Sequence, residues 1–362
     1  MKYRIAALCT VVLTLTAACN SNALQRGHAP VGPSLSPGAY VGDMIYSQPG
    51  ERISIGSGRL NLYCIGSGSP TVVFDGGWGD WSPSWAIVLP RVAKWTRACS
   101  FDRAGYGFSD AGPMPRTSVR NADELHTALH NASLSGPYVL VAHAFGSYNM
   151  RAFADRHMQD VGGIVLVDSD DGDVEPAKWQ ARDHRNFRDI IATMRLCQHA
   201  VVRGLPLPPL PSPSGLPPGT CADQFFRGLP ERRFSNELNS TLLHEVQTQS
   251  SLYDAAISEM EEMPWDEAYL QQHVTSFGSR PIRVLTTWHF GRPPATPASV
   301  HRERLAFEHD SALAQGSWLR LSTKARQVFD YDESGRYIQL DQPHIVLEAI
   351  REVLDTMPGS HI

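Results

Sequence analysis

The chain has 362 residues, 42% of them hydrophobic, so it can bury a large core and is expected to form one large domain with an insertion, or two domains. Its 32 basic and 37 acidic residues give a formal net charge of -5. This balance leaves no polycationic surface, which argues against nucleic acid as a partner.

The N-terminus has the pattern of an export signal. Lys2 and Arg4 carry positive charge ahead of the apolar segment 5–18, which is too short to span a bilayer comfortably. We therefore expect residues 1–18 to be a signal peptide that directs export from a bacterial cytoplasm. Proline, serine and glycine are frequent in the residues that follow, and segment 19–50 is predicted to be a flexible tether.

Cys19 leaves two alternatives open for the processed N-terminus. Small residues precede it, as in a bacterial lipobox, whose cysteine is lipidated and becomes the new N-terminus. Thr16 departs from that motif, which prefers an aliphatic residue at this position. The alternative is simple cleavage near Ala18 or Ala23. The product would be periplasmic, anchored to the outer membrane, or secreted.

Export makes the remaining cysteines interpretable, because disulfides persist in oxidising compartments. Four cysteines remain beyond the signal region: Cys64, Cys99, Cys197 and Cys221. An even number fits two disulfides, but four cysteines allow three pairings. No pair of them has the spacing of a metal site, and no metal ligand set is predicted.

Apolar segments of strand length alternate with helical segments along much of the chain. Continuous apolar strands in this arrangement are typical of a parallel sheet covered by helices on both faces. The predicted strands are 59–65, 71–74, 98–102, 139–142, 163–168, 281–287 and 327–331. The predicted helices are 84–94, bent or interrupted at Pro90, then 121–131 and 344–357.

Segment 174–279 lacks strand signals and is predicted to be a helical insertion. Its expected helices are 177–196, 231–251 and 254–262, and they surround a proline-rich loop at 204–219. Such an insertion is typical of a cap over an active-site mouth. A disulfide between Cys197 and Cys221 would close the loop and limit its freedom.

Segment 138–151, YVLVAHAFGSYNMR, joins a buried strand to an amphipathic run through a tight turn. Strand, sharp turn and helix form the geometry of a nucleophile elbow, whose consensus is G-x-S-x-G. The five positions are occupied by Ala142, His143, Ala144, Phe145 and Gly146. The methyl group of Ala144 has no lone pair and no acidic proton, so it cannot form an acyl intermediate. The segment therefore predicts a catalytic scaffold without its nucleophile.

In combination, these motifs resemble the α/β-hydrolase superfamily, in the branch of exported bacterial esterase-like proteins. The likeness is carried by PTVVFDGGWGDWSPSW, CSFDRAGYGFSD, GPYVLVAHAFGSYNMRAFA, GIVLVD and SGRYIQLDQPHIVLEAIREVL. It implies an eight-stranded, mostly parallel sheet formed by 51–173 and 280–362, with 174–279 as the cap. In that fold the strands holding Cys64 and Cys99 are neighbours, so the resemblance favours the pairs Cys64–Cys99 and Cys197–Cys221.

The resemblance also implies roles for individual residues. Trp78 lies where the oxyanion loop donates a backbone N–H, and Phe145 would donate the second. Arg336, in SGRYIQ, stands where the catalytic histidine is expected, and an arginine stays protonated and cannot act as a base. Asp168 and Asp171 are the candidates for the acid, with a solvated loop end as the alternative interpretation of this acidic cluster.

Two of the three triad positions are therefore changed. We hypothesise that Arg336 forms a static ion pair with Asp168 or Asp171, in place of the contact that a histidine would make. His289 is the reserve base, but without a nucleophile it would need to activate water directly. Arg103 is interpreted as a structural ion-pair partner rather than a catalyst.

By resemblance, the chain is a carboxylic ester hydrolase for a lipophilic small-molecule ester, with catalysis impaired or lost. The alternative is a catalytically inactive pseudohydrolase that acts as a ligand-binding or sensing module, and a third possibility is a structural envelope protein. The expected partner is a small-molecule ester or carboxylate, with no nucleic acid and no cofactor, because the glycines near Gly76 lack dinucleotide-binding spacing. A monomer or weak oligomer is expected, with a lipid on Cys19 in the lipoprotein alternative.

Overall fold

The computed structural model describes residues 43–169, 177–210, 219–226, 228–287, 306, 309–330 and 335–357, with backbone alone for 177–186 and 330. Among these residues, eight strands form one sheet in the order β1-β2-β4-β3-β5-β6-β7-β8. The strands are β1 (Glu51–Ser54), β2 (Arg59–Ile65), β3 (Val72–Asp75), β4 (Ala98–Asp102), β5 (Tyr138–His143), β6 (Val161–Val167), β7 (Ile282–Thr287) and β8 (Ala325–Asp330).

The sheet is antiparallel only at one edge. β1 pairs with β2 and β2 with β4 in antiparallel register, whereas the remaining pairs, from β4–β3 to β7–β8, are parallel. The central strands are apolar on both sides because helices cover both faces. This arrangement confirms the expected α/β-hydrolase fold with a mostly parallel eight-stranded sheet.

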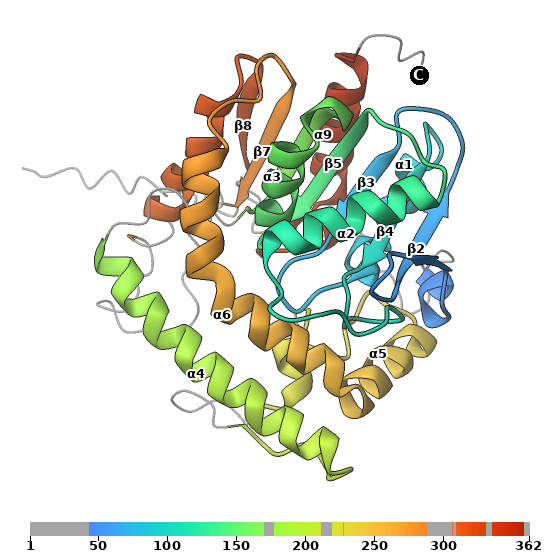
Figure 1. Cartoon of the computed structure of the whole chain (residues 1–362), viewed down its shortest axis with the longest axis vertical. Helices are drawn as coiled ribbons and strands as arrows, with labels where there is room; N and C mark the ends of the chain where they lie inside the picture. Colours follow the sequence, from blue (N-terminus) through green and yellow to red (C-terminus); the bar gives the residue numbers. More distant parts are fainter. Residues whose placement is uncertain are drawn as a thin grey trace, which may run out of the picture. The chain divides into compact units, whose positions relative to one another are not determined.

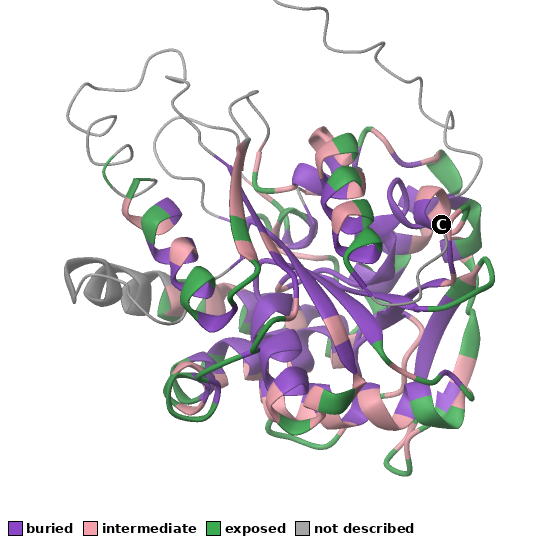
Figure 2. Cartoon of the chain, turned by 90° about the horizontal axis from the view of Figure 1, so that it is seen from above, coloured by how far each residue is buried: buried purple, intermediate pink, exposed green. Residues whose placement is uncertain are grey.

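Alternate strand residues supply the cores on the two faces. On one face, residues such as Val73 and Leu140 pack with α2 (Ser118–Asn131) and α3 (Gly146–Arg156). On the other, Val72 and Val139 pack with the one-turn helix α1 (Leu89–Val92) and α9 (Pro343–Asp355). Figure 1 shows α2 and α3 in front of the sheet, and Figure 2 shows its central strands as a continuous buried layer.

The helix predicted over 84–94 is interrupted, but the break lies between Trp85 and Leu89 and not at Pro90. The chain instead forms a 3₁₀ turn, η3 (Ser82–Trp85), followed by α1. Pro83 and Pro90 both lie in the first turn of their elements, where the missing N–H has no intrahelical partner to lose. The segment therefore forms two short helical elements, η3 and α1, in place of one continuous helix.

The insertion is helical, as expected, with different boundaries. It contains α4 (Ala177–Val202), the 3₁₀ turn η5 (Cys221–Gln224), α5 (Asn236–Thr248) and α6 (Ser250–His273). α5 begins after Ser235, whose side chain accepts a hydrogen bond from the Leu238 N–H as an N-cap. α6 continues through Pro264 instead of ending at the predicted residue 262.

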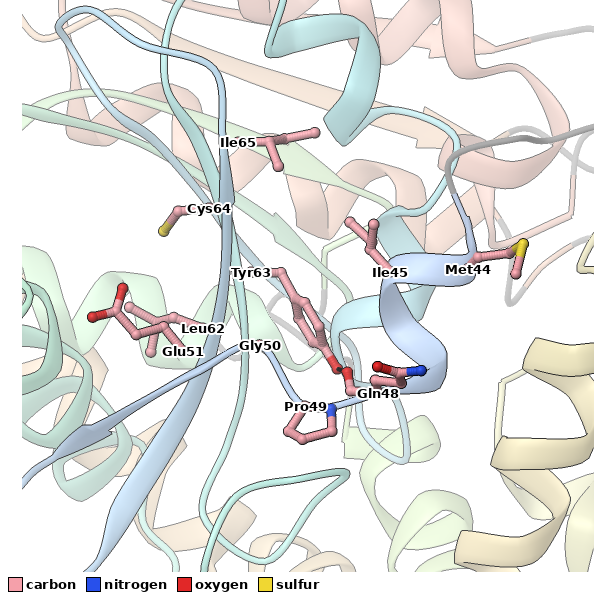
Figure 3. Close-up of a pocket in the computed structure, with 10 residues that line it drawn as sticks. All are labelled: Met44, Ile45, Gln48, Pro49, Gly50, Glu51, Leu62, Tyr63, Cys64 and Ile65. Atoms are coloured by element: carbon pink, nitrogen blue, oxygen red, sulfur yellow. Dashed lines mark hydrogen bonds between the residues drawn. The ribbon is translucent and has the colours of Figure 1, made fainter.

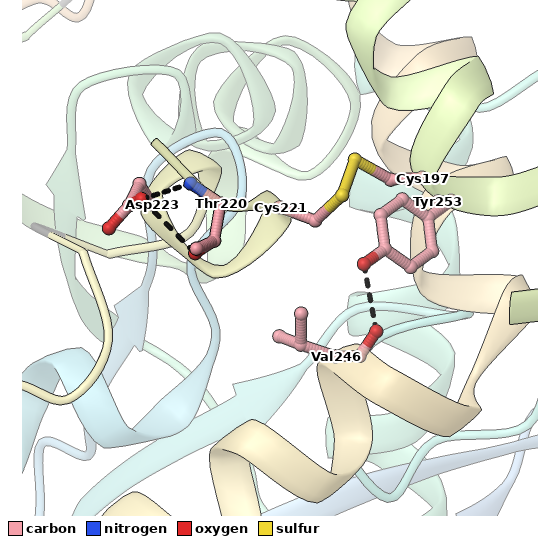
Figure 4. Close-up of a disulfide and its surroundings, with 6 residues drawn as sticks. All are labelled: Cys197, Thr220, Cys221, Asp223, Val246 and Tyr253. Carbon is pink, nitrogen blue, oxygen red and sulfur yellow. Dashed lines mark hydrogen bonds between the residues drawn. A yellow bond between two sulfur atoms is a disulfide. The ribbon is translucent and has the colours of Figure 1, made fainter. Parts of the chain in front are cut away.

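Both predicted disulfides are present. Cys64 and Cys99 are directly paired residues of β2 and β4. Cys197 of α4 is bonded to Cys221 of η5, beside Tyr253, whose hydroxyl donates to the Val246 carbonyl oxygen at 2.8 Å (Figure 4). The second bridge ties the two halves of the insertion on either side of the proline-rich loop.

The predicted tether 19–50 is wrong at its C-terminal end. Residues 43–47 form the 3₁₀ turn η2 (Asp43–Ser47), in which Asp43 and Tyr46 are buried. Asp43 accepts a hydrogen bond from the Ser235 N–H at 2.6 Å, so this turn packs against the start of α5. These contacts explain the burial that the Pro, Ser and Gly content of the segment does not indicate.

A surface hollow of about 480 Å³ lies beside η2, lined mainly by residues of η2 and β2 (Figure 3). Tyr63 crosses its floor, and its hydroxyl donates to the Gln48 carbonyl oxygen at 2.7 Å. None of the predicted catalytic residues lines this hollow. Of the helices described, none combines the length and the apolar character needed to cross a bilayer.

Glu245, on helix α5 of the insertion, has a buried carboxyl group. It is 2% exposed, and neither carboxyl oxygen has a hydrogen-bond partner among the described residues. Burial, together with the nearby Asp102 carboxylate, raises the pKa of Glu245 to about 9. Glu245 is therefore protonated in the folded protein at neutral pH.

Because Glu245 is buried, the free energy of unfolding should depend on pH through this group, and Glu245→Gln should remove that dependence. Between the unfolded pKa of 4.5 and the folded value of about 9, the native state holds a proton that the unfolded state releases. Stability from this group is therefore lost as pH rises, by up to about 1.4 kcal/mol per pH unit. Glu245→Gln should gain stability relative to the parent from about pH 5 to about pH 8 in urea unfolding, whereas the exposed Glu237→Gln on the same helix should not. A constant difference across this range would contradict the assignment.

Candidate active site

The elbow between β5 and α3 is formed as the sequence predicts. Ala144 has a left-handed φ of +44°, and its N–H donates to the Val167 carbonyl oxygen at 3.1 Å. Gly146 begins α3, and a side chain there would place its Cβ 2.7 Å from the Gly76 carbonyl oxygen. The turn therefore has the strained backbone of a nucleophile elbow, and only the side chain at its apex lacks a nucleophile.

Ser147, the next hydroxyl along the chain after Ala144, does not lie at the apex of the elbow. Ala144 is 8% exposed at the apex, whereas Ser147, three residues later, is fully buried in the first turn of α3. A buried hydroxyl inside the helix is not presented to a substrate at the apex. The elbow alone therefore supports no covalent intermediate.

The guanidinium of Arg103 positions the loop 75–80. Arg103 donates to the carbonyl oxygens of Gly76 and Gly77 at 3.0 and 2.9 Å. It also forms buried ion pairs with Asp75 at 2.8 Å and with Glu259 of α6 at 2.7 Å. These contacts agree with the interpretation of Arg103 as a structural ion-pair partner, and they turn the loop carbonyls toward the protein interior.

The two predicted oxyanion donors keep their backbone N–H groups. Within the described residues, neither the Trp78 nor the Phe145 N–H donates a recorded hydrogen bond, as expected of donors reserved for a ligand. The Trp78 indole points elsewhere, because its Nε1–H donates to the Ala256 carbonyl oxygen of α6 at 2.7 Å. This contact ties the oxyanion loop to the cap.

Asp168 follows β6 and is the acid candidate that the structure describes. It is 5% exposed and accepts hydrogen bonds from Arg336 Nε at 2.8 Å, Thr287 Oγ1 at 2.9 Å and Gln315 Nε2 at 3.3 Å. Burial alone would raise the pKa of Asp168, but the Arg336 guanidinium and these hydrogen bonds lower it below its ordinary value. Asp168 is a buried carboxylate that accepts hydrogen bonds from three side chains, and the hypothesised Arg336 contact is confirmed.

His143 connects the elbow to the chain around Arg336. Its Nε2 lies 3.0 Å from the Arg336 carbonyl oxygen, and its Nδ1 lies 3.2 Å from Asp80 Oδ2. Tyr337 packs on the imidazole at 4.6 Å between ring centroids and donates its hydroxyl to Asp80 Oδ1 at 3.0 Å. Since a carbonyl oxygen only accepts, Nε2 donates in this contact. Both ring nitrogens of His143 are therefore engaged by protein groups.

Residues 70–192 match the family model described as alpha/beta hydrolase fold. An AB hydrolase superfamily protein of Gibberella zeae is 26% identical over 310 residues, which are 79% of this chain and 86% of that protein. The chain therefore has the α/β-hydrolase fold, and its residues 70–192 are similar to that family. An uncharacterised protein of Schizosaccharomyces pombe is 34% identical over 170 residues, but the match spans 39% of this chain and only 31% of that protein.

Solved structures of α/β-hydrolases share the fold. The epoxide hydrolase CorEH has a TM-score of 0.59 at 15% identity, over 84% of this chain and 98% of its own. A thermophilic esterase from Thermogutta terrifontis has a TM-score of 0.55 at 20% identity, over 85% of this chain and 98% of its own. At these identities the likeness shows the shared fold.

Several residues of this α/β-hydrolase site were not predicted from the sequence. Asp80 directly follows the motif GGWG, and Tyr337 directly follows SGR. These neighbouring motifs were the only sequence feature that could have indicated either residue. Thr287 ends a predicted strand, while Gln315 and Glu259 lie far from any motif. Of the predicted residues, Asp171, His289 and Cys19 lie outside the described part of the chain.

The ion pair predicts an acid-sensitive contribution to stability. The folded pKa of Asp168 is lowered, so its stabilisation is present above the unfolded pKa and is lost as pH falls through the folded value. Arg336→Gln should cost ~1 kcal/mol at neutral pH, because the Arg336 side chain is 61% exposed and partly screened. The cost should shrink as pH falls below the ordinary value of 3.8. Urea unfolding at neutral pH and at a series of lower pH values, with Arg336→Lys as the charge-preserving control, measures this; an equal cost across the series would show a packing effect instead.

Proposed function

We propose that this chain is an esterase-like α/β-hydrolase that has lost serine catalysis and binds a small-molecule ester or carboxylate at the former active site. The observation that carries the proposal is the 2.8 Å ion pair between Arg336 Nε and Asp168 Oδ2, beside an elbow whose apex is Ala144. The carboxylate that would orient a catalytic histidine is engaged by a group that cannot accept a proton.

Backbone groups support a ligand with an oxygen-centred negative or partial negative charge. The N–H groups of Trp78 and Phe145 do not depend on side-chain identity, so the loss of a serine leaves them in place. A carboxylate or an ester carbonyl presents the acceptor that such donors recognise. The positive charge of Arg336 nearby adds an electrostatic preference for the carboxylate.

Apolar groups beside Trp78 support a lipophilic substituent on that ligand. Ile190 and Ile191 of α4 and the Trp78 ring are partly buried, and they pack against both the sheet core and the cap core. Side chains that lie partly open at the junction of two apolar clusters can bury additional hydrocarbon. An acyl chain or an aromatic ester fits this chemistry.

Export is part of the proposal. The N-terminal signal pattern and the two disulfides support a location outside the cytoplasm, where oxidised cysteines persist. A lipid on Cys19 or a free processed N-terminus are the two forms in which the protein would reach that location.

Residual ester hydrolysis is the alternative function, favoured by the retained oxyanion loop. An intact loop and binding site contribute catalysis even without a nucleophile, in other serine hydrolases on the order of 10³–10⁴-fold over water. In this alternative His289 would activate water directly.

Hydrolysis of p-nitrophenyl esters of increasing chain length distinguishes the two functions. The unaltered chain should not exceed a heat-inactivated sample, because Ala144 cannot be acylated. Ala144→Ser with Arg336→His should restore turnover by about 10²-fold or more over Ala144→Ser alone, since the serine then has a base held by Asp168. Adding Ser147→Ala to the double variant should leave this gain unchanged.

Turnover by the unaltered chain well above the inactivated control would replace the proposal with the residual-hydrolase alternative.

The binding function is tested separately, by calorimetry with octanoate and ethyl octanoate. We expect saturable binding of at least one of them by the unaltered chain, weakened for octanoate by Arg336→Gln. No saturable heat with either compound would refute the binding function.

A further inference from the structure

Two histidines and an aspartate meet at the surface where α2 packs beside α3, far from the elbow along α3 (Figure 1). His126 Nε2 lies 3.0 Å from Asp160 Oδ2, and the rings of His126 and His157 stack at 3.6 Å between centroids. One potential ligand atom from each of the three residues lies within 4.8 Å of the others. The α/β-hydrolase site does not use any of them.

Short, well-bonded backbone segments position the three side chains. His126 lies on the third turn of α2, while His157 ends α3 through an N–H bond to the Phe153 carbonyl oxygen at 2.8 Å. Asp160 belongs to the following 3₁₀ turn, η4 (Met158–Asp160), and its N–H donates to the His157 carbonyl oxygen at 2.9 Å. His157 and Asp160 are thus three residues apart in a tight turn, which brings their side chains to the same side.

One ring nitrogen of His157 is buried without a hydrogen-bond partner among the described residues. His157 Nε2 lies 3.4 Å from Asp123 Oδ1 and has no hydrogen bond of good geometry. Asp123 is itself bonded to Arg156 at 2.5 Å, which leaves Asp160 as the carboxylate for an ion. Tyr269 of α6 faces Arg156 and Asp155 beside this cluster.

We propose that His126, His157 and Asp160 bind Zn²⁺ and thereby fasten the end of α3 to α2. Two imidazole nitrogens and one carboxylate oxygen are a donor set that Zn²⁺ accepts, with water at a fourth position. Zinc bonds of about 2.0–2.2 Å require ligand atoms closer than the 4.8 Å limit, and each imidazole lone pair lies in its ring plane, so the two parallel rings must rotate out of their stacked arrangement to bind one ion. The existing 3.0 Å contact between His126 and Asp160 already has the required separation.

Sequence spacing does not reveal this site. Metal motifs place ligands a few residues apart, whereas His126 and His157 lie on separate helices and meet only because α2 and α3 pack together. Only His157 and Asp160 are close in the chain, and two residues do not define a site. Because the two histidines are far apart in the sequence, no metal site was predicted there.

Zinc titration of the full chain after EDTA treatment and dialysis tests the proposal. We expect one Zn²⁺ per chain by calorimetry and a rise of several degrees in Tm at saturating zinc, both reversed by EDTA. His157→Gln and Asp160→Asn should each weaken zinc binding by about 10-fold or more. His130→Gln, an exposed histidine one turn further along α2, should bind zinc as the unaltered chain does.

Co²⁺ provides a readout that does not depend on variant folding. In the unaltered chain it should give the intense visible absorption of a four-coordinate site, displaced by one equivalent of Zn²⁺. The proposal is overturned if the chain binds no zinc, or if His157→Gln and His130→Gln bind it equally. It is also overturned if Co²⁺ shows only the weak spectrum of the hydrated ion.

Discussion

The buried guanidinium of Arg103 is the interaction on which the site depends. All five of its N–H bonds are used, by Asp75, by both oxygens of Glu259 and by the carbonyl oxygens of Gly76 and Gly77. One side chain thus joins the end of β4, the oxyanion loop after β3 and the cap helix α6. Removal of either carboxylate would leave one or two buried N–H groups of Arg103 without an acceptor, which costs about 1–3 kcal/mol.

A second set of contacts joins the C-terminal part of the chain to the same loop. His143 and Tyr337 both bond to Asp80, and His143 also bonds to the Arg336 carbonyl oxygen. The backbone of Arg336 is therefore positioned by the elbow strand while its side chain reaches Asp168. The connection between this segment and the elbow strand runs through the Arg336 carbonyl oxygen, so it does not depend on which side chain stands at position 336.

The parts of the molecule that the sequence predicts well are those where local pattern and global fold agree. The apolar strands β3, β5 and β6 are stable only when buried in a parallel sheet. Gly146 is needed because a side chain at this position would collide with the Gly76 carbonyl oxygen. The Arg336–Asp168 contact was predictable because both residues occupy motif positions at neighbouring strand ends.

The residues that were missed depend on packing between distant segments. Glu259 lies on a cap helix with no motif, so nothing in the sequence connects it to Arg103. α6 passes through Pro264, and η2 is ordered by Ser235 and Tyr63, which override local composition. His126 and His157 meet only after α2 and α3 have docked.

The elbow shows which features of an active site belong to the fold and which belong to the chemistry. A left-handed φ of +44° at Ala144 costs about 1–2 kcal/mol, and no reacting side chain accounts for it. It persists because the Ala144 N–H bonds to Val167, α3 begins two residues later, and Gly146 packs against the oxyanion loop. Since β6, α3 and the loop each require this turn, the backbone of the elbow does not depend on the side chain at its apex. A methyl group at position 144 is thus compatible with a fully formed elbow.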